Sequence, residues 1–376
     1  MLDFLRRRTT ESDTATEHRS SAAKPVPNVP TLTPELPGEP SATDISLAAA
    51  PVHLVASKTR LRMENSTLVI EKKCGEEVRR PIEHVSAIHI YGGGLISSAV
   101  VSELSAMGRS IIWRSHSGYP VSWNAPMAPA GLAARRNQYR ISENQPERLA
   151  FSKNIISTKI TNMRGFLRRR KVLEDDIARR MEKQAKSAFH CRNEKSLLGI
   201  EGTATRTYFS SFPALLKHKG AVEKFAGRSR RPPSNLANST MSYLYAVLLG
   251  ECVCAIAAAG LDPRCGIFHR ERAGRPALAL DLMEPFRAPI VDACVTTAIN
   301  TGAILSKHAR KEGAGQLLSD NGKRKALAAI EKRYAEQITR LEQKGAKSWR
   351  DQIHHDALLL ADILRNGGSF TPMRYP

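Results

Sequence analysis

A stretch of twenty residues with a single charge, from Met241 to Gly260, limits most strongly how this chain can fold. It is close to the ~20 residues that a membrane-spanning helix needs. Its one charged residue, Glu251, would then lie near the middle of the bilayer, at a cost of roughly 2.5–3.5 kcal/mol. A helix that is apolar on nearly every side is also typical of the centre of a helical domain. We therefore expect a buried core helix and no membrane segment.

The region before this stretch, residues 52–125, has the pattern of a small β-rich domain. Short apolar runs are separated by turn residues, which is typical of a β-sandwich or sheet. Ser97 is a suitable N-cap for one embedded helix that runs through Leu104. The expected strands are Val52–Ala56, Arg60–Met63, Thr67–Ile70, Glu77–Ile82, Val85–Tyr91, Ser110–Trp113 and Tyr119–Trp123. We predict a β-sandwich-like domain with one embedded helix.

The apolar pattern becomes helical after a proline-rich bend at residues 126–129. Spacings of four, three and four residues, the period of an amphipathic helix, occur at Ile156, Ile160, Met163 and Leu167. Residues 126–137 are therefore assigned to a linker and residues 138–376 to a larger, all-α domain. The predicted fold class is α+β, with the small β-rich domain first.

The first 50 residues are rich in Pro, Ser and Thr, with six prolines between Pro25 and Pro40. Such a segment cannot bury enough apolar surface to offset its chain entropy, so we predict a disordered tail. The first eight residues contain no apolar run long enough for a signal peptide. None of the six cysteines has zinc-ligand spacing. Reduced, buried thiols and a cytoplasmic protein are expected.

The chain has a formal charge of +21 and a pI near 10.0. A strongly basic balance indicates polyanionic partners, first nucleic acid and second an anionic membrane surface. The basic groups are spread along the chain, as at 168–171, 228–231 and 323–325. Dispersion favours a folded basic surface over a terminal tether, although any one cluster could equally be a solvated helix face.

Three short segments supply acidic residues and one histidine within the helical part. They contain Glu201, His269, and the pair Asp281 and Glu284. Carboxylates that hold a hard cation, inside a basic protein that holds a polyanion, indicate an enzyme acting on phosphodiesters. Taken singly, each has a simpler explanation: Glu201 as a surface residue, His269 as a structural one, and Asp281-x-x-Glu284 as a helix capping box.

The sequence around these residues resembles the CRISPR adaptation integrase family, Cas protein one. The resemblance spans about residues 52–370, and includes the order of β-rich and helical parts. It rests on Gly227–Pro233, Tyr243–Tyr245, Gly260–Pro263, Gly266–His269 and Leu278–Arg287. The segment Ser234–Ser242 departs from the family pattern and keeps only Asn238 and Ser242.

The resemblance implies a metal-dependent catalytic site in the helical domain. By family analogy Glu201, His269 and Glu284 bind Mg²⁺ or Mn²⁺, with Asp281 beside them as an outer or alternative ligand. The implied function is a DNA endonuclease and integrase of CRISPR adaptation, an antiviral defence. A DNA 3′-hydroxyl attacks a phosphodiester at the edge of the CRISPR repeat, so no protein nucleophile is required. Arg228, Arg230 and Arg231 are candidate contacts to DNA phosphates.

The partners implied by the resemblance are double-stranded DNA, both protospacer and CRISPR repeat or leader, a second copy of the chain, and a dimer of Cas protein two. Two other classes of function stay open. One is a stand-alone transposon-type integrase or structure-selective nuclease on the same fold. The other is a non-catalytic DNA-binding scaffold, which capable ligands at all the site positions disfavour.

Overall fold

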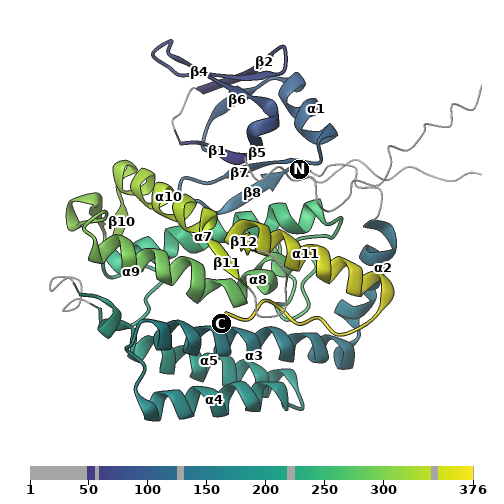
Figure 1. Cartoon of the computed structure of the whole chain (residues 1–376), viewed down its shortest axis with the longest axis vertical. Helices are drawn as coiled ribbons and strands as arrows, with labels where there is room; N and C mark the ends of the chain where they lie inside the picture. Colours follow the sequence, from purple (N-terminus) through teal and green to yellow (C-terminus); the bar gives the residue numbers. More distant parts are fainter. Residues whose placement is uncertain (1–48, 56–58, 125–130, 218–224, 340–345, 376) are drawn as a thin grey trace, which may run out of the picture. The chain divides into compact units, whose positions relative to one another are not determined.

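The computed structural model describes residues 49–55, 59–124, 131–217, 225–339 and 346–375 (Figure 1). The predicted disordered tail, residues 1–50, lies outside these ranges except for Ala49 and Ala50, and Ala50 already belongs to the first strand. By residue contacts, Asp44–Pro376 forms one compact unit. The β-rich and helical parts are therefore described as two regions of that unit.

The β-rich region contains two four-stranded sheets, in the orders β1-β5-β7-β8 and β4-β3-β2-β6. Its elements are β1 (Ala50–Leu54), β2 (Thr59–Glu64), β3 (Thr67–Glu71), β4 (Glu77–Pro81), a 3₁₀ turn (Ile82–His84), β5 (Val85–Tyr91), β6 (Gly94–Ile96), α1 (Ser98–Ala106), β7 (Ser110–Arg114) and β8 (Pro120–Trp123). Each predicted strand is present, and β6 is an additional one. Turn residues between short apolar runs thus predicted the strands of this region except β6.

Both sheets and α1 share one apolar cluster. Leu61 and Leu68 of the second sheet pack with Ile88 and Ile111 of the first, and Leu104 of α1 is fully buried among them. The side chain of Ser97 accepts the backbone N–H of Val100 at the start of α1, as the N-cap assignment predicted. A sandwich-like region with one embedded helix is the result.

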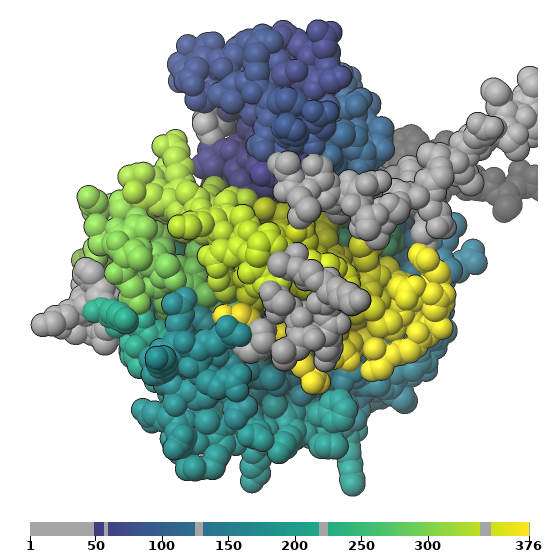
Figure 2. Space-filling model, in the orientation of Figure 1, coloured from purple at the N-terminus to yellow at the C-terminus, as the bar shows by residue number. Residues whose placement is uncertain are grey.

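The helical region runs from α2 to α11. Its helices are α2 (Gly131–Glu143), α3 (Gln145–Arg169), α4 (Asp175–Phe189), α5 (Glu194–Ser210), α7 (Leu236–Ala258), α8 (Ala277–Met283), α9 (Ala293–Asn300), α10 (Asp320–Ala335) and α11 (Trp349–Asn366). Shorter turns lie at Phe212–Leu215, Glu284–Phe286, Arg287–Asp292 and Ser306–His308. Helices α3, α4 and α5 lie side by side (Figure 1), and α10 packs along α11 (Figure 2).

The linker prediction for residues 126–137 needs a correction. Residues 131–137 form the first half of α2, and its buried positions include Ala134 and Gln138. The Gln138 side chain donates to the backbone carbonyls of Asp262 and Cys265, at 2.7 and 2.8 Å. The helix is therefore held by tertiary contacts to a distant loop, which a local reading of the prolines could not reveal.

The apolar stretch is the core helix α7, as predicted. By length and composition it could cross a membrane, but 83% of its most apolar window is buried inside the protein. Gly250 lies where a Cβ would be 2.0 Å from the guanidinium of Arg114. That guanidinium donates to the backbone carbonyl of Ala246 at 3.0 Å, so a strand of the first sheet and the core helix are joined directly.

The helical region is not purely α-helical. Two antiparallel strand pairs lie within it, β9 (Ala309–Glu312) with β10 (Gly315–Leu318), and β11 (Gln337–Thr339) with β12 (Ala346–Ser348). The β9 sequence, Ala-Arg-Lys-Glu, is mostly exposed and has no apolar alternation, so the usual strand signal is missing. The α+β class, with a β-rich region followed by a mainly helical one, is confirmed.

Candidate active site

Four separate elements position the acidic residues and the histidine. Glu201 lies on α5, His269 in the loop between α7 and α8, Asp281 on α8, and Glu284 in the turn that follows α8. Helix α8 begins at Ala277, so Asp281 is not an N-cap and the capping-box explanation does not hold. His269 contacts both Asp281 and Glu284, and one further residue, Lys159 of α3, pairs with Glu284 and Glu201, so that all four side chains are connected.

Glu284 is the most enclosed of the candidate ligands, with 4% of its side chain exposed. Its Oε2 lies 2.7 Å from Nζ of Lys159 and 2.9 Å from Nε of Arg287. Burial alone would raise the pKa of Glu284. The positive charges of Arg287 and Lys159, together with His269, outweigh burial and hold the pKa far below its ordinary value. Glu284 is therefore a permanent carboxylate.

Glu201 meets the same ammonium group. Its Oε1 is paired with Nζ of Lys159 and accepts the hydroxyl of Thr205 at 3.0 Å. Two carboxylates from distant parts of the sequence thus share one cation. The Glu201 side chain is 23% exposed, whereas Lys159 is 7% exposed, so Glu201 forms the more open side of the site.

Asp281 orients the histidine. Its carboxylate accepts three backbone N–H groups, those of Ile267, Phe268 and His269, at 2.7–3.0 Å. It also lies 2.7 Å from Nδ1 of the His269 ring. Because a carboxylate only accepts, Nδ1 donates to it, and in the neutral ring the lone pair is then on Nε2. That Nε2 is 3.8 Å from Oε1 of Glu284.

The loop that carries His269 is packed so closely that a glycine is needed in it. A Cβ on Gly266 would be 2.3 Å from the carbonyl oxygen of His269 and 2.6 Å from the Ala277 side chain. The Gly-Ile-Phe-His segment is thereby folded back onto the start of α8. This local fold places the ring of His269 beside Glu284.

An outer layer of aromatic and acidic groups supports Arg287. Its guanidinium lies over the ring of Tyr245 at 4.9 Å. The hydroxyls of Tyr245 and Tyr208 donate to Asp292 at 2.6 and 2.7 Å. Burial raises the pKa of Asp292 to about 6, although both hydrogen bonds and the nearby charges of Arg228 and Arg287 oppose that shift. Arg287 is therefore fixed by stacking as well as by charge.

Lys159 and Arg287 were not predicted from the sequence as members of the site. Lys159 follows Ile156 by three residues and precedes Met163 by four, so it lies on the buried stripe of α3. A lysine at a core position of an amphipathic helix was the available signal. Arg287 ended the motif that carried the resemblance, but no role was assigned to it.

These residues have the chemistry of a site for a hard divalent cation. Two carboxylates and an imidazole with a free Nε2 are suitable ligands, and the Asp281–His269 contact is typical of support for a metal-binding histidine. The Lys159 ammonium already stands as a cation between the two carboxylates. Within the described ranges, however, no three His, Cys, Asp or Glu side chains are grouped closely enough to hold an ion as they stand.

The three arginines of the 228–231 loop differ in their surroundings. The Arg228 guanidinium donates to the side chains of Asn238 and Ser242, at 3.1 and 3.0 Å, and lies over the ring of Tyr245. Arg230 and Arg231 are exposed. The contacts of Arg228 favour a role in holding the loop, whereas Arg230 and Arg231 are accessible to a ligand.

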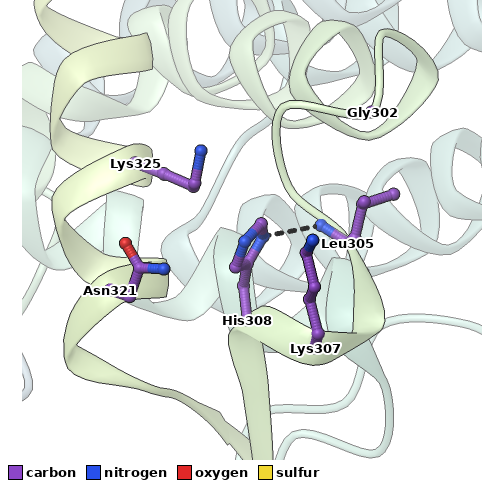
Figure 3. A pocket seen from close by; sticks show the side chains of 6 residues that line it. All are labelled: Gly302, Leu305, Lys307, His308, Asn321 and Lys325. Carbon is purple, nitrogen blue, oxygen red and sulfur yellow. Dashed lines mark hydrogen bonds between the residues drawn. The ribbon is translucent and has the colours of Figure 1, made fainter.

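Several concave surfaces of the described ranges carry clusters of basic side chains. One, of about 560 Å³, includes Thr205, Arg206, Phe209, Arg228 and Arg230, and adjoins the carboxylate site because Thr205 binds Glu201. A second, of about 400 Å³, lies between the Ser306–His308 turn and the start of α10 (Figure 3). Its lining residues are Gly302, Leu305, Lys307, His308, Asn321 and Lys325, none of them acidic.

The sequence matches the family described as CRISPR associated protein Cas1 over residues 52–332. A protein named CRISPR-associated endonuclease Cas1 from Moorella thermoacetica is 28% identical over 336 residues, 86% of this chain and 98% of that protein. A fusion named Cas4 exonuclease/Cas1 endonuclease from Geobacter sulfurreducens is 31% identical over 324 residues, 84% of this chain. The chain spans 58% of the length of that fusion.

Solved structures give the same result. A CAS1 protein from Thermotoga maritima superposes with a TM-score of 0.71 at 28% identity, over 86% of this chain and 99% of that one. A casposase bound to an integration product gives 0.74 at 23% identity, over 86% and 94%. A Cas6-RT-Cas1–Cas2 complex gives 0.71 at 22%, over 88% and 36%; at such identities the likeness concerns the fold alone. With a family match across most of its length and this fold, the chain belongs to the CRISPR associated protein Cas1 family.

Proposed function

We propose that this protein is a metal-dependent DNA endonuclease and integrase that inserts protospacer DNA into a CRISPR array. One observation carries the proposal: Glu201 and Glu284 share a single cation, and Nε2 of His269 lies 3.8 Å from Glu284. Such an arrangement is suited to a divalent ion with room left for substrate oxygens. The names of the Cas1 relatives, which describe endonucleases, support the same chemistry.

In this proposal Glu201, Glu284 and His269 are the ligands of Mg²⁺ or Mn²⁺. A bound ion would supply Lewis-acid chemistry, polarising the phosphodiester and lowering the pKa of the attacking DNA 3′-hydroxyl. Asp281 would hold His269 in the tautomer that leaves Nε2 free. Arg287 would remain paired with Glu284, because stacking on Tyr245 fixes its guanidinium.

DNA would bind across the basic concave surfaces. Arg206, Arg228 and Arg230 line the one that includes Thr205, the hydrogen-bond partner of Glu201, and Arg231 is a further candidate phosphate contact. Lys307 and Lys325 of the second concave surface point toward the same space (Figure 3) and are further candidate phosphate contacts. Phosphate contacts position a duplex without reading its sequence, which suits a protein that handles varied protospacers.

The assembly proposed is a homodimer that binds a dimer of Cas protein two and double-stranded DNA of the protospacer and of the CRISPR repeat or leader. It is supported by the similarity in fold to a Cas6-RT-Cas1–Cas2 complex. The burial of α7, the one apolar helix of spanning length in the described ranges, is consistent with a soluble prokaryotic protein of the cytoplasm.

A transposon-type integrase is the second candidate function, because the fold is equally similar to a casposase bound to an integration product. Strand transfer separates the two. The protein and its Cas protein two partner are incubated with a duplex bearing 3′-hydroxyl ends and either a repeat-bearing or a repeat-free supercoiled plasmid, with and without Mn²⁺. We expect metal-dependent insertion at the repeat edge. Equal insertion into both plasmids favours the transposon-type function, and no insertion with intact DNA binding favours a scaffold.

The DNA contacts have their own test. Replacing Arg230 and Arg231 together with Ala should flatten the plot of log K against log salt by about 0.9 per lost contact. Arg228→Ala is the matched control from the same loop, since its guanidinium is used by Asn238 and Ser242. It should lower the melting temperature and leave the slope of the folded protein unchanged. The reverse pattern would assign DNA contact to Arg228 instead.

A further inference from the structure

Lys159 is a charged side chain in an unusual place. It lies on α3 with 6% of its surface exposed, on the stripe formed by buried residues such as Ile156 and Met163. Among the described residues, its Nζ is in contact with the carboxylates of Glu201 and Glu284. A buried ammonium is costly unless paired, so these two contacts are what makes a lysine tolerable at this core position.

The carboxylates depend on the lysine in turn. Glu284 keeps Arg287 as a second ion-pair partner, whereas the described ion pair of Glu201 is with Lys159, and Arg287 acts on Glu201 only through its charge. Two ionised carboxylates that face one another repel when no cation stands between them. In the absence of a metal ion, Lys159 therefore offsets this repulsion and keeps both carboxylates paired with one cation.

The two cations near Glu284 are not equivalent. Arg287 is a planar group stacked on Tyr245, and its position is fixed. Lys159 is a compact charge on a flexible four-carbon stem, so its ammonium can move while α3 stays in place. A divalent ion ligated by Glu201 and Glu284 would need the same space and the same oxygens, and like charges there would repel.

We propose that Lys159 is the resident counter-ion of the metal-free site, and that a divalent ion must displace its ammonium from Glu201 and Glu284 in order to bind. The inference rests on the proposed metal site. It gives the lysine a positioning role: it keeps the two carboxylates paired with one cation when no metal is bound, and it lowers the apparent affinity for metal by competing for the same oxygens.

The test is Mn²⁺ binding by the intact protein, measured by calorimetry and by the shift of melting temperature between EDTA and Mn²⁺. Lys159→Met removes the competing charge and keeps the apolar stem. We expect its Mn²⁺ dissociation constant to fall by about tenfold or more. In EDTA it should melt at a lower temperature than the wild type, and its gain on adding Mn²⁺ should be larger.

Three further variants define the outcome. Lys153→Met, on the same helix but away from the carboxylates, should leave the Mn²⁺ affinity unchanged, and Lys159→Arg should not tighten it. If Lys159→Met does not fold, Lys159→Gln takes its place with the same expectation. Unchanged or weaker Mn²⁺ binding in Lys159→Met or Lys159→Gln would overturn the inference, because the lysine would then be a support for the bound metal.

A failure of the underlying metal site would look different. In that case neither the wild-type protein nor Glu201→Ala would show a Mn²⁺-dependent shift of melting temperature. If the wild type binds Mn²⁺ and Glu201→Ala does not, the site stands, and the Lys159 variants alone decide whether the ammonium is displaced.

Discussion

Two buried glutamates of this protein have closely similar partners, but only one of them belongs to the proposed metal site. Glu284 and Glu251 are each at most 5% exposed. Each is paired with a cation that also binds a second glutamate: Lys159 connects Glu284 with Glu201, and Arg350 connects Glu251 with Glu331. Each also has a histidine nearby, His269 in one cluster and His354 in the other.

The clusters differ in how firmly the shared cation is held. Arg350 makes two hydrogen bonds of 2.9 Å to Glu331 and lies over the ring of Tyr334 at 4.6 Å. A planar, stacked guanidinium that donates from Nη2 to both oxygens of Glu331 and from Nε to Glu251 cannot leave without breaking several contacts. The ammonium of Lys159 has none of this support from an aromatic ring among the described contacts. We therefore expect Arg350 to stay in place in the Glu251 cluster, and Lys159 to be exchangeable for another cation in the Glu284 cluster.

The presence of a neighbouring cavity does not distinguish the Glu284 cluster from the Glu251 cluster. Glu251, Glu331, Arg350 and His354 line a cavity of about 400 Å³ where β1, α7, α10 and α11 meet. The burial of a carboxylate with Arg and His partners is thus a poor sign of catalysis by itself. What separates the clusters is a replaceable cation together with a histidine whose Nε2 is free.

The largest expected effect tests the chemical role of Glu284. Glu284→Ala should reduce strand transfer by more than about 100-fold and abolish the Mn²⁺-dependent rise in melting temperature, since loss of outer supports alone costs 10–100-fold. DNA affinity should change little, because it comes from many phosphate contacts. Gel-shift and strand-transfer assays on the same preparation check both. Retained strand transfer would place the metal elsewhere.

The next effect tests the structural role of the other cluster. Arg350→Ala leaves Glu251 and Glu331 buried without their shared guanidinium, and should lower the free energy of unfolding by about 3–5 kcal/mol. Urea denaturation measures the loss. The folded fraction should keep the wild-type affinity for Mn²⁺. A variant that is stable but no longer binds Mn²⁺ would reverse the assignment of the two clusters.

A smaller effect is expected at Asp281, which touches the proposed ligand His269 and no other proposed ligand. Asp281→Asn keeps the size of the side chain but weakens its hold on Nδ1 and on three backbone N–H groups. Mn²⁺ affinity should fall by about 10–100-fold, with Glu201 and Glu284 still paired to Lys159. Calorimetry measures the change, and an effect as large as that of Glu284→Ala would make Asp281 a direct ligand.

Sequence patterns predicted the parts of this protein that depend on local signals. Turn residues between apolar runs located the strands of residues 50–123, and the single charge in Met241–Gly260 indicated a core helix. The motifs also brought Glu201, His269 and Glu284 into one hypothesis, and the structure places these three side chains around Lys159 and Asp281. Their roles as metal ligands stay a prediction.

What the sequence could not supply are the partners that tertiary structure provides. Lys159 looks like any lysine of a basic helix until α3, α5 and the turn after α8 are brought together. The strand pair β9–β10 has no apolar alternation, and α2 begins inside the segment assigned to a linker. Likewise, Arg228 and Arg230 are two residues apart, and no sequence signal distinguishes them. In the structure Arg228 donates to the side chains of Asn238 and Ser242, whereas Arg230 is exposed.

The smallest expected effect concerns the stability of the Glu251 cluster in acid. Burial would raise the pKa of Glu251, but Arg350, His354 and His89 hold it well below its ordinary value of 4.5. The Glu331 pKa is also lowered, by His53 and Arg350, against the opposing effect of burial. A carboxylate with a depressed pKa in the folded state stabilises the protein above its unfolded pKa, and that stability is lost as the pH falls through the folded pKa. Wild-type stability should therefore decline as the pH falls below about 4.5.

Glu251→Gln removes one of these carboxylates while keeping its shape. The variant should be less stable than the wild type at pH 7 by roughly 1–3 kcal/mol, because Arg350 loses a charged partner. Its stability should also depend less steeply on pH below about 4.5, because one fewer proton is taken up on unfolding. Urea denaturation at a series of pH values measures both, and Mn²⁺ should not alter the difference. If the stability of the variant depends on pH as steeply as that of the wild type, Glu251 is not ionised in the folded protein and is not comparable with Glu284.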